Sequence, residues 1–189
     1  MVQVNQSNRG SWHPVVFASP FVAPPVVVMG PASYNDNQPT TVRVRSVTTT
    51  GFEFKIDEWN YLDGVHGQES IGYLALDPGV HQLGGLTWEA TRLSGVGSVF
   101  QTVPFAGSFA SKPVVLAQVV TTLNTVGGQN RALITRVQNV TSTSFAVRIQ
   151  AEESYQTALS GETVCVLAVS PGLASIPGFR VLASVVFYK

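Results

Sequence analysis

The sequence is short of charged residues and of long apolar runs. Charged side chains make up 12% of the 189 residues, and the 11 basic and 11 acidic residues cancel. Ordinary globular proteins carry about 25% charged residues. Lys and Arg form no cluster of the kind that binds nucleic acid phosphates, and no apolar stretch reaches membrane-spanning length. We therefore expect neither a nucleic acid partner nor insertion into a membrane.

The low charge also bears on assembly. With a mean hydropathy of +0.20 and so few charges, a monomer is expected to expose large apolar patches. Such patches are normally covered by other subunits in an oligomer. We therefore expect a homo-oligomer.

Cysteine is nearly absent, and a secretory signal is not seen. The one cysteine, Cys165, can form no intrachain disulfide. Its apolar neighbours in Thr163–Val169 predict a buried structural thiol. The first residues, MVQVNQSNRGSW, lack the basic start and apolar run of a signal peptide. We expect an extracellular or virion-surface location, reached as a mature fragment or by another route.

What the sequence does contain is an internal repeat. Arg43–Leu76 aligns without a gap on Arg136–Val169, each residue 93 positions from its counterpart. Upstream, Phe17–Val27 aligns on Phe105–Val115 at an offset of 88. The change of offset predicts a five-residue insertion near Leu123–Gln129, as a hairpin tip. The identities at the larger offset are Arg43/Arg136, Val47/Val140, Phe52/Phe145, Ile56/Ile149, Glu69/Glu162, Leu74/Leu167 and Ala75/Ala168.

Each repeat reads as a set of short strands. In Gly51–Glu58 the apolar side chains alternate with Glu53, Lys55 and Asp57, so we expect one face in the core and the other against water or a partner. Glu58 lies on the inward side, where we interpret it as a strand-end residue. Ser70–Leu76 is apolar on both faces, which predicts a central strand covered on both sides.

The predicted architecture is all-β: two tandem small antiparallel β-sandwiches of about six strands each. We expect the first in residues 1–93 and the second in residues 94–189, joined by a short hinge at Leu93–Ser98. In this scheme the repeats close with the strands Gly85–Thr91 and Gly178–Ala183.

Residues kept in both repeats are interpreted as scaffold. Glu69 and Glu162 are expected to bond to Arg43 and Arg136 across the sheet.

Residues that only one repeat carries are candidates for function. Trp59 has Glu152 as its counterpart, so we expect an exposed or interfacial tryptophan rather than a core one, and we interpret the Glu152-Glu153 pair as a solvated rim. An exposed indole suits stacking on a sugar ring. The alternative is a subunit contact, which tryptophan also favours.

The loop that follows carries Asn60, Tyr61, Asp63 and His66, none of which the second repeat keeps. A metal site of Asp63, His66 and Glu69 has a spacing that matches no common structural site. No nucleophile motif or phosphate-binding glycine loop occurs. We therefore predict a binding protein with no metal, no cofactor and no enzymatic activity.

The first repeat carries a combined pattern of Phe17-Ala-Ser-Pro-Phe21, Pro24-Pro25-Val-Val, Arg43, Ser46-Val47, Gly51-Phe52, Trp59 and Ser70-Ile71. With these residues on the predicted strands, the first repeat resembles an H-type lectin domain. The resemblance spans Val15 to Leu76, and the second repeat matches more loosely.

The resemblance implies a six-stranded sandwich that binds N-acetylgalactosamine or another surface sugar. It also implies trimers, sometimes paired into hexamers, with sugar sites at subunit boundaries. The strand-end tryptophan of the family falls on Trp59, and the histidine that usually follows it is replaced by Asn60. The ligand arginine of the family would fall near Pro39, so that contact is missing or is supplied by Arg45.

We therefore expect a lectin-like module that binds cell-surface glycans through an oligomer. The alternative is a structural trimeric spike, fibre or decoration subunit of a phage or phage-like particle with no sugar binding of its own. The predicted sugar-binding residues are Arg45, Trp59, Asn60, Tyr61, Asp63 and His66.

Overall fold

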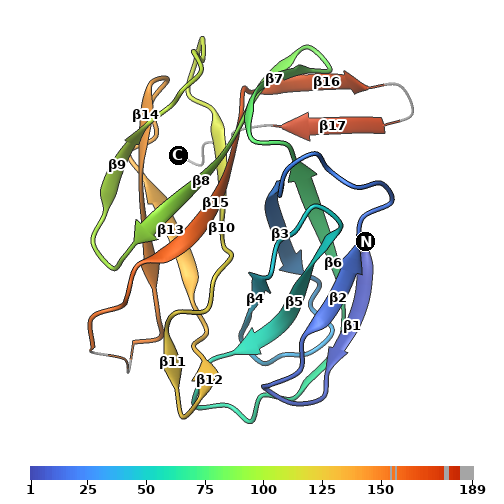
Figure 1. The fold of residues 1–189 in the computed structure, drawn as a ribbon, viewed down its shortest axis with the longest axis vertical. Coiled ribbons are helices and arrows are strands. Elements are labelled where there is room, and N and C mark those ends of the chain that lie inside the picture. The colour runs from blue at the N-terminus through green and yellow to red at the C-terminus, as the bar shows by residue number, and fades with distance from the viewer. Residues whose placement is uncertain (154, 156, 177–178, 184–189) are drawn as a thin grey trace.

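The computed structural model describes residues 1–153, 155, 157–176 and 179–183, and every regular element within them is a β-strand (Figure 1). The all-β prediction is confirmed. In the first half the strands are β1 (Val2–Gln6), β2 (His13–Val16), β3 (Val26–Ala32), β4 (Thr40–Arg45), β5 (Gly51–Glu58), β6 (His66–Leu76), β7 (Gly79–Leu83) and β8 (Leu86–Val96). In the second half they are β9 (Gln101–Pro104), β10 (Val114–Val119), β11 (Thr125–Val126), β12 (Gln129–Asn130), β13 (Ile134–Gln138), β14 (Ser144–Gln150), β15 (Glu162–Val169), β16 (Gly172–Ile176) and β17 (Phe179–Ala183).

The strands form two small antiparallel sandwiches, as predicted. The first packs the sheet β1-β6-β3 on the sheet β2-β5-β4, and the second packs β10-β15-β8, extended by β7, on β13-β14-β9. Phe52, Phe54 and Ile56 are buried in the first core, and Phe145 and Ile149 in the second. The alternation in β5 and β14 therefore marks the core face correctly.

The two sandwiches share specific contacts at equivalent positions. Phe17 packs edge-on against Phe21 with ring centroids 4.9 Å apart, and Phe105 packs in the same way against Phe109 at the same distance. The backbone N–H of Phe17 donates to the carbonyl of Thr50, as Phe105 does to Thr143. In each half, the phenylalanine that follows β2 or β9 therefore binds the turn of the β4–β5 or β13–β14 hairpin.

The predicted insertion is a hairpin. β11 and β12 pair through a two-residue turn at Gly127 and Gly128, whose φ angles are 56° and 77°. Two successive residues with positive φ are the signature of the hairpin turns that suit glycine. Cys165 is buried and unpaired, as expected.

One strand assignment from the sequence is wrong. The stretch Gly85–Thr91 was expected to close the first repeat. All of it except Gly85, which lies in the preceding turn, belongs to β8, and β8 pairs along β15 in the second sandwich. Leu93–Ser98 is not a free hinge either, because Leu93 to Val96 lie within β8, and the expected boundary at residue 93 falls inside the same strand. The first repeat thus supplies a strand, β8, that pairs with the central strand β15 of the second sandwich.

The polar face of β5 does not face water. Lys55 and Asp57 are fully buried, with Lys55 Nζ 3.0 Å from Asp57 Oδ1. Asn130 of the second sandwich donates to the other carboxylate oxygen of Asp57 at 2.9 Å, and Arg43 donates to the carbonyl of Thr121. Lys55 Nζ also donates to the carbonyl of Arg9 at 2.7 Å. This face is therefore covered by the second sandwich and by the N-terminal segment of the same chain.

The expected bonds between the repeated arginines and glutamates are absent. Arg43 is buried against the second sandwich, whereas Arg136 is exposed and donates to Gln150. The environments differ because only Arg43 has a neighbouring sandwich to face. Identity across the repeat therefore does not imply the same contact.

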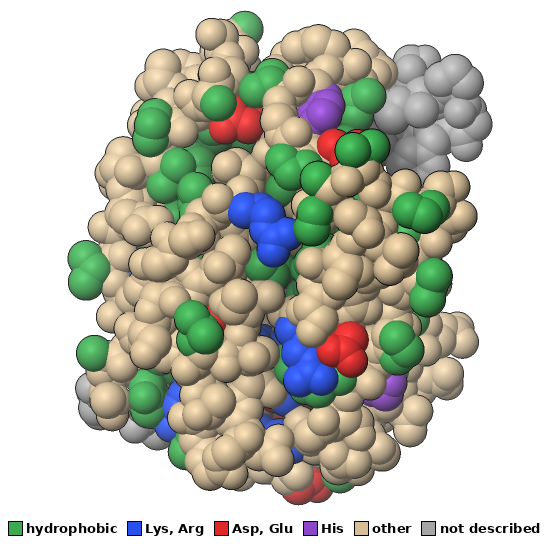
Figure 2. Space-filling model, in the orientation of Figure 1, with side chains coloured by type: hydrophobic (Ala, Val, Ile, Leu, Met, Phe, Trp, Pro, Cys, Tyr) green, Lys and Arg blue, Asp and Glu red, His purple; other side chains and the backbone are tan. Residues whose placement is uncertain are grey.

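The surface matches the low charge of the sequence. On the face drawn in Figure 2, hydrophobic side chains lie scattered among polar atoms, and Lys and Arg side chains gather near the boundary between the two sandwiches. Large apolar side chains that are exposed include Val16, Val22, Tyr34, Tyr61 and Val99.

The crossing of β8 into the second sheet yields a stability prediction. A Cβ added to Gly161 would lie 2.7 Å from the Cα of Gly95 in β8, whereas a Cβ on Gly72 of β6 would meet nothing within 4 Å. Because the contact at Gly161 is with backbone, Gly161→Ala should cost about 1–3 kcal/mol of unfolding free energy. Gly72→Ala is the matched control and should leave the urea midpoint nearly unchanged. Equal effects of the two substitutions would contradict this packing of β8.

Candidate functional site

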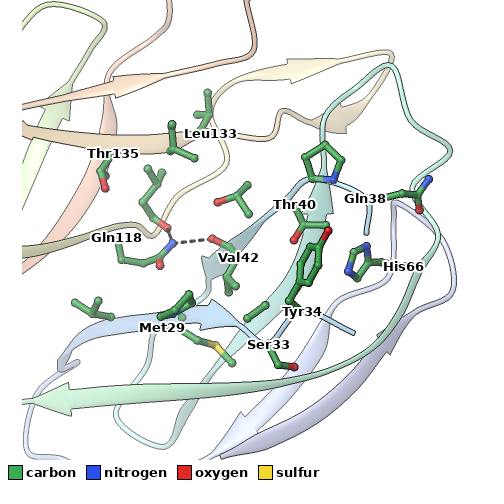
Figure 3. A pocket seen from close by; sticks show the side chains of 18 of the residues that line it. Met29, Ser33, Tyr34, Gln38, Thr40, Val42, His66, Gln118, Leu133 and Thr135 are labelled. Atoms are coloured by element: carbon green, nitrogen blue, oxygen red, sulfur yellow. Dashed lines mark hydrogen bonds between the residues drawn. The ribbon is translucent and has the colours of Figure 1, made fainter. Parts of the chain in front are cut away.

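Two hollows flank the loop that joins β3 to β4. The first is a cavity of about 600 Å³ between this loop and strands β10 and β13 of the second sandwich. Figure 3 shows Tyr34 and Thr40 on one side, Leu133 and Thr135 on the other, and the Gln118 side chain donating to the carbonyl of Val42 between them. The cavity thus lies at the boundary between the two sandwiches and has a size typical of small-molecule sites.

The second hollow is wider, and most of the residues that line it have polar side chains. Its volume is about 890 Å³, and it lies over the start of β6. Asp36, Gln38 and His66 line both hollows and so form the wall between them. The other residues that line the second hollow are Asn5, Gln6, Ser7, Asp63, Val65, Gly67 and Gln68.

His66 is held between two buried carboxylates. Its Nδ1 lies 3.2 Å from Glu58 Oε1, and its Nε2 lies 3.4 Å from Glu69 Oε1. Asp36 Oδ2 is 3.9 Å from Nδ1. With acceptors at both nitrogens, the ring is fixed in orientation and presents its edge to the hollows.

Glu58 is more than a strand-end residue. It is buried at the end of β5 and accepts from the backbone N–H of Gly64 at 2.8 Å. With the Gln38 amide oriented to suit its neighbours, its nitrogen donates to Glu58 Oε1 at 2.9 Å. One carboxylate therefore ties together the loops on both sides of the hollow.

Glu69 shapes the loop that separates the hollows. Its carboxylate accepts from the Ser33 hydroxyl and from the backbone N–H groups of Asn35 and Asp36. In the second sandwich Glu162 makes the equivalent bonds to the Thr121 hydroxyl and to the backbone of the residues that follow. The glutamate that both halves keep therefore holds, through hydrogen bonds, the loop that follows β3 in the first sandwich and β10 in the second.

These bonds control the acidity of the glutamates. Burial alone would raise the pKa of the Glu69 carboxyl, but the hydrogen bonds from Ser33, Asp36, Asn35 and His66 outweigh it and lower that pKa. The pKa of Glu162 is lowered against burial in the same way. Both groups therefore stabilise the fold as carboxylates.

Asp36 faces the hollows as an anion. The backbone N–H of Gly67 donates to its Oδ2 at 2.8 Å and that of Gln38 to its Oδ1 at 3.1 Å. These backbone bonds, that of Gly67 above all, lower the pKa of the Asp36 carboxyl. The loop thus displays a fixed carboxylate beside the amide of Gln38.

The structure separates the predicted sugar-binding residues. Asp63 and His66 line the hollows, whereas Arg45 pairs with Glu53 at 2.8 Å and stacks on the Trp12 ring, 4.1 Å from its centroid. Arg45 is thus engaged away from both hollows.

Trp59 and Asn60 lie at the contact between the two sandwiches. Trp59 is half-buried, and the backbone N–H of Asn60 donates to Glu152 Oε2 at 2.8 Å. Glu152 also faces Arg131 and is buried, so its interpretation as a solvated rim residue is wrong. Tyr61 is exposed and lines neither hollow.

No sequence pattern marks Tyr34, Asp36 and Gln38 as functional residues. They lie in a loop without a motif, upstream of the repeat's gapless alignment. The change of offset between the repeats falls in the equivalent loop of the second repeat, and it is the one feature that marks this loop as different in the two halves.

No group of three or more His, Cys, Asp and Glu side chains suited to a metal ion occurs among the described residues. In the same part of the chain, no helix is long and apolar enough to cross a membrane.

A small sandwich with a hollow lined by carboxylate, amide and hydroxyl groups, and with a tyrosine at its rim, has the features of a carbohydrate-binding domain. Comparison with known families agrees: residues 12–76 match the H-type lectin domain. Residues 12–76, which lie in the first sandwich, are therefore similar to the H-type lectin domain, a class of domain that binds carbohydrate and is typically not catalytic.

A second similarity covers more of the chain. Over 129 residues, or 67% of this chain, it is 30% identical to halomucin from Haloquadratum walsbyi (strain DSM 16790 / HBSQ001). The chain spans about 1% of the length of that relative. No solved structure was found to match the chain.

The hydrogen bonds that Glu69 accepts from the loop after β3 predict a specific pH dependence of the unfolding free energy. Because its pKa is lower in the folded state than the ordinary value of 4.5, its contribution to stability is complete above pH 4.5 and is lost as pH falls through the lowered pKa. Glu69→Gln, which does not titrate, should flatten the fall in unfolding free energy between pH 5 and about pH 3. Urea titrations across that range measure it. Glu162→Gln should behave alike, and an unchanged slope in both variants would contradict the assignment.

Proposed function

We propose that this chain binds cell-surface glycans in the two hollows around Asp36, Gln38 and His66. The observation that carries the proposal is that the H-type lectin match, residues 12–76, includes these three residues and Tyr34. The residues that match a sugar-binding family thus include the residues that form the wall between the two hollows.

The chemistry of the site suits a sugar. The Asp36 carboxylate accepts hydrogen bonds from hydroxyl groups. The Gln38 amide nitrogen donates to Glu58 and Val65, which leaves its oxygen as a further acceptor for a sugar hydroxyl. Tyr34 lines the first cavity and is 80% exposed, so its ring is free to stack on the apolar face of a pyranose. Asp63 adds a second carboxylate at the far side of the wider hollow. N-acetylgalactosamine is the first sugar to test.

Binding strength is proposed to come from several sites acting together. The second sandwich has the same pair of packed phenylalanines as the first, and its Glu162 binds a loop as Glu69 does. These shared contacts support a second, divergent lectin-like module. The similarity to halomucin supports this too, because it extends beyond residues 12–76. An oligomer, for which the family suggests a trimer, would multiply weak single-site affinities by avidity. Its proposed location is outside the cell or on a particle surface.

A structural role is the second candidate. The turn at Trp59 and Asn60 lies against Glu152 of the second sandwich, where the backbone N–H of Asn60 donates to that carboxylate. That contact favours a subunit of a spike, fibre or particle coat whose lectin-like sandwiches only assemble.

Two exposed tyrosines allow a matched test of the site. Tyr34 lines the first cavity, whereas Tyr61, 67% exposed, lines neither hollow. On a glycan array, Tyr34→Ala should weaken binding about tenfold or more, the loss of one stacking contact, and Tyr61→Ala should bind as wild type. Neither side chain is needed for folding, so circular dichroism spectra should be unchanged.

The same glycan array would also reveal the results that contradict the proposed site or the lectin proposal. If Trp59→Ala abolishes binding while Tyr34→Ala does not, the site lies at the turn between the sandwiches. If the intact wild-type protein binds no glycan at all, the structural role replaces the lectin proposal.

A further inference from the structure

The central strand of the first sandwich has an unfinished edge. In the second sandwich, β8 pairs with β15 along nearly its whole length, from Trp88 opposite Val169 to Val96 opposite Glu162. In the first sandwich, β1 occupies the same side of β6 but reaches only from His66 to Ile71. Residues 72–76 of β6 therefore have a strand neighbour, β3, on one side only among the described residues.

The backbone groups on that open side can be assigned. Ser70 exchanges hydrogen bonds with Ser33 on the β3 side. Because backbone groups alternate sides along a strand, Tyr73 and Ala75 point their N–H and C=O groups away from β3. An unpaired row of this kind is a template for another strand.

Burial shows the same difference between the two central strands. Cys165 to Val169 in β15 are all buried, with at most 4% of any residue exposed. Their counterparts, Gly72 to Leu76, are half-buried or exposed, and Leu74 is 38% exposed where Leu167 is 1%. An apolar segment that is covered in one copy of the repeat is thus uncovered in the other.

The chain also carries a strand, β17, whose second edge has no partner among the described strands and would fit the open edge of β6. β16 and β17 lie 93 residues after β7 and the first half of β8, and they pair in the same register: Gly172 opposite Ala183 corresponds to Gly79 opposite Ala90. β8 uses its other edge to pair with β15, whereas β17 pairs with β16 alone among the described strands. Figure 1 shows the β16–β17 hairpin extending to one side of the sandwiches.

From these observations we propose that copies of this chain associate head to tail, with β17 of one copy pairing antiparallel to residues 74–76 of β6 in the next. The contact repeats between chains the one that β8 and β15 make within the chain. By that equivalence, Val181, Leu182 and Ala183 lie opposite Leu76, Ala75 and Leu74.

The contact is heterologous, because the two copies contribute different surfaces. Repetition closes it into a ring or extends it into a fibre, according to the rotation between neighbours. Strand addition of this kind takes its affinity from main-chain hydrogen bonds and its specificity from alternate side chains.

The test uses one proline on each side of the contact. Ala75→Pro removes an N–H that faces the open edge, a position where a monomer tolerates proline. Leu182→Pro removes the equivalent N–H of β17, since Leu182 corresponds to Glu89, whose backbone faces β15. Ala75→Ser, which keeps the N–H, is the matched control.

Sedimentation velocity from about 1 μM to 1 mM should show wild type and Ala75→Ser growing beyond the 20.2 kDa monomer. Each proline variant alone should stay monomeric. An equal mixture of the two should form dimers and nothing larger, because each variant retains the surface that the other lacks. A wild type that stays monomeric throughout, or proline variants that associate as wild type does, would overturn the proposal. Glycan binding by a monomeric variant would leave the proposed function standing.

Discussion

The structure depends on one constraint: a sandwich of this design is complete only when its central strand is paired on both sides. The second sandwich meets the constraint with β8, a strand that the repeat alignment places with the first half of the chain. This crossing of β8 holds the two sandwiches together more firmly than a linker would, because β8 cannot separate without breaking its hydrogen bonds to β15. The first sandwich meets it only in part, through the short β1.

Buried charged and polar side chains lie at the boundary between the two sandwiches. Buried Lys55 and Asp57 meet Asn130, and Arg43 reaches Thr121. A buried charge is tolerable only when it is paired and hydrogen-bonded, so these contacts require the two sandwiches to keep a fixed relation. The cavity beside Tyr34 lies along the same boundary, and its shape therefore depends on that relation.

The sequence was sufficient for the class of fold and insufficient for how the sandwiches meet. Alternation in β5 identified Phe52 and Phe54 as core, because a buried face must be apolar. It could not tell that Lys55 faces a second sandwich, because a polar face has the same pattern against water or against a polar partner. A repeat period also does not show where a unit begins, so β8 was assigned to the wrong sandwich. For the site, the sequence indicated Asp63 and His66, but Asp36 joins them only through the fold.

The most direct test of the central claim is amide hydrogen exchange in the dilute monomer. Tyr73 and Ala75 on β6 are the counterparts of Val166 and Ala168 on β15, so the four amides differ mainly in whether a strand lies opposite. An unfinished edge predicts that Tyr73 and Ala75 exchange at least about a hundredfold faster than Val166 and Ala168. Equal protection of all four amides would show that the first sandwich is already complete and would contradict the account.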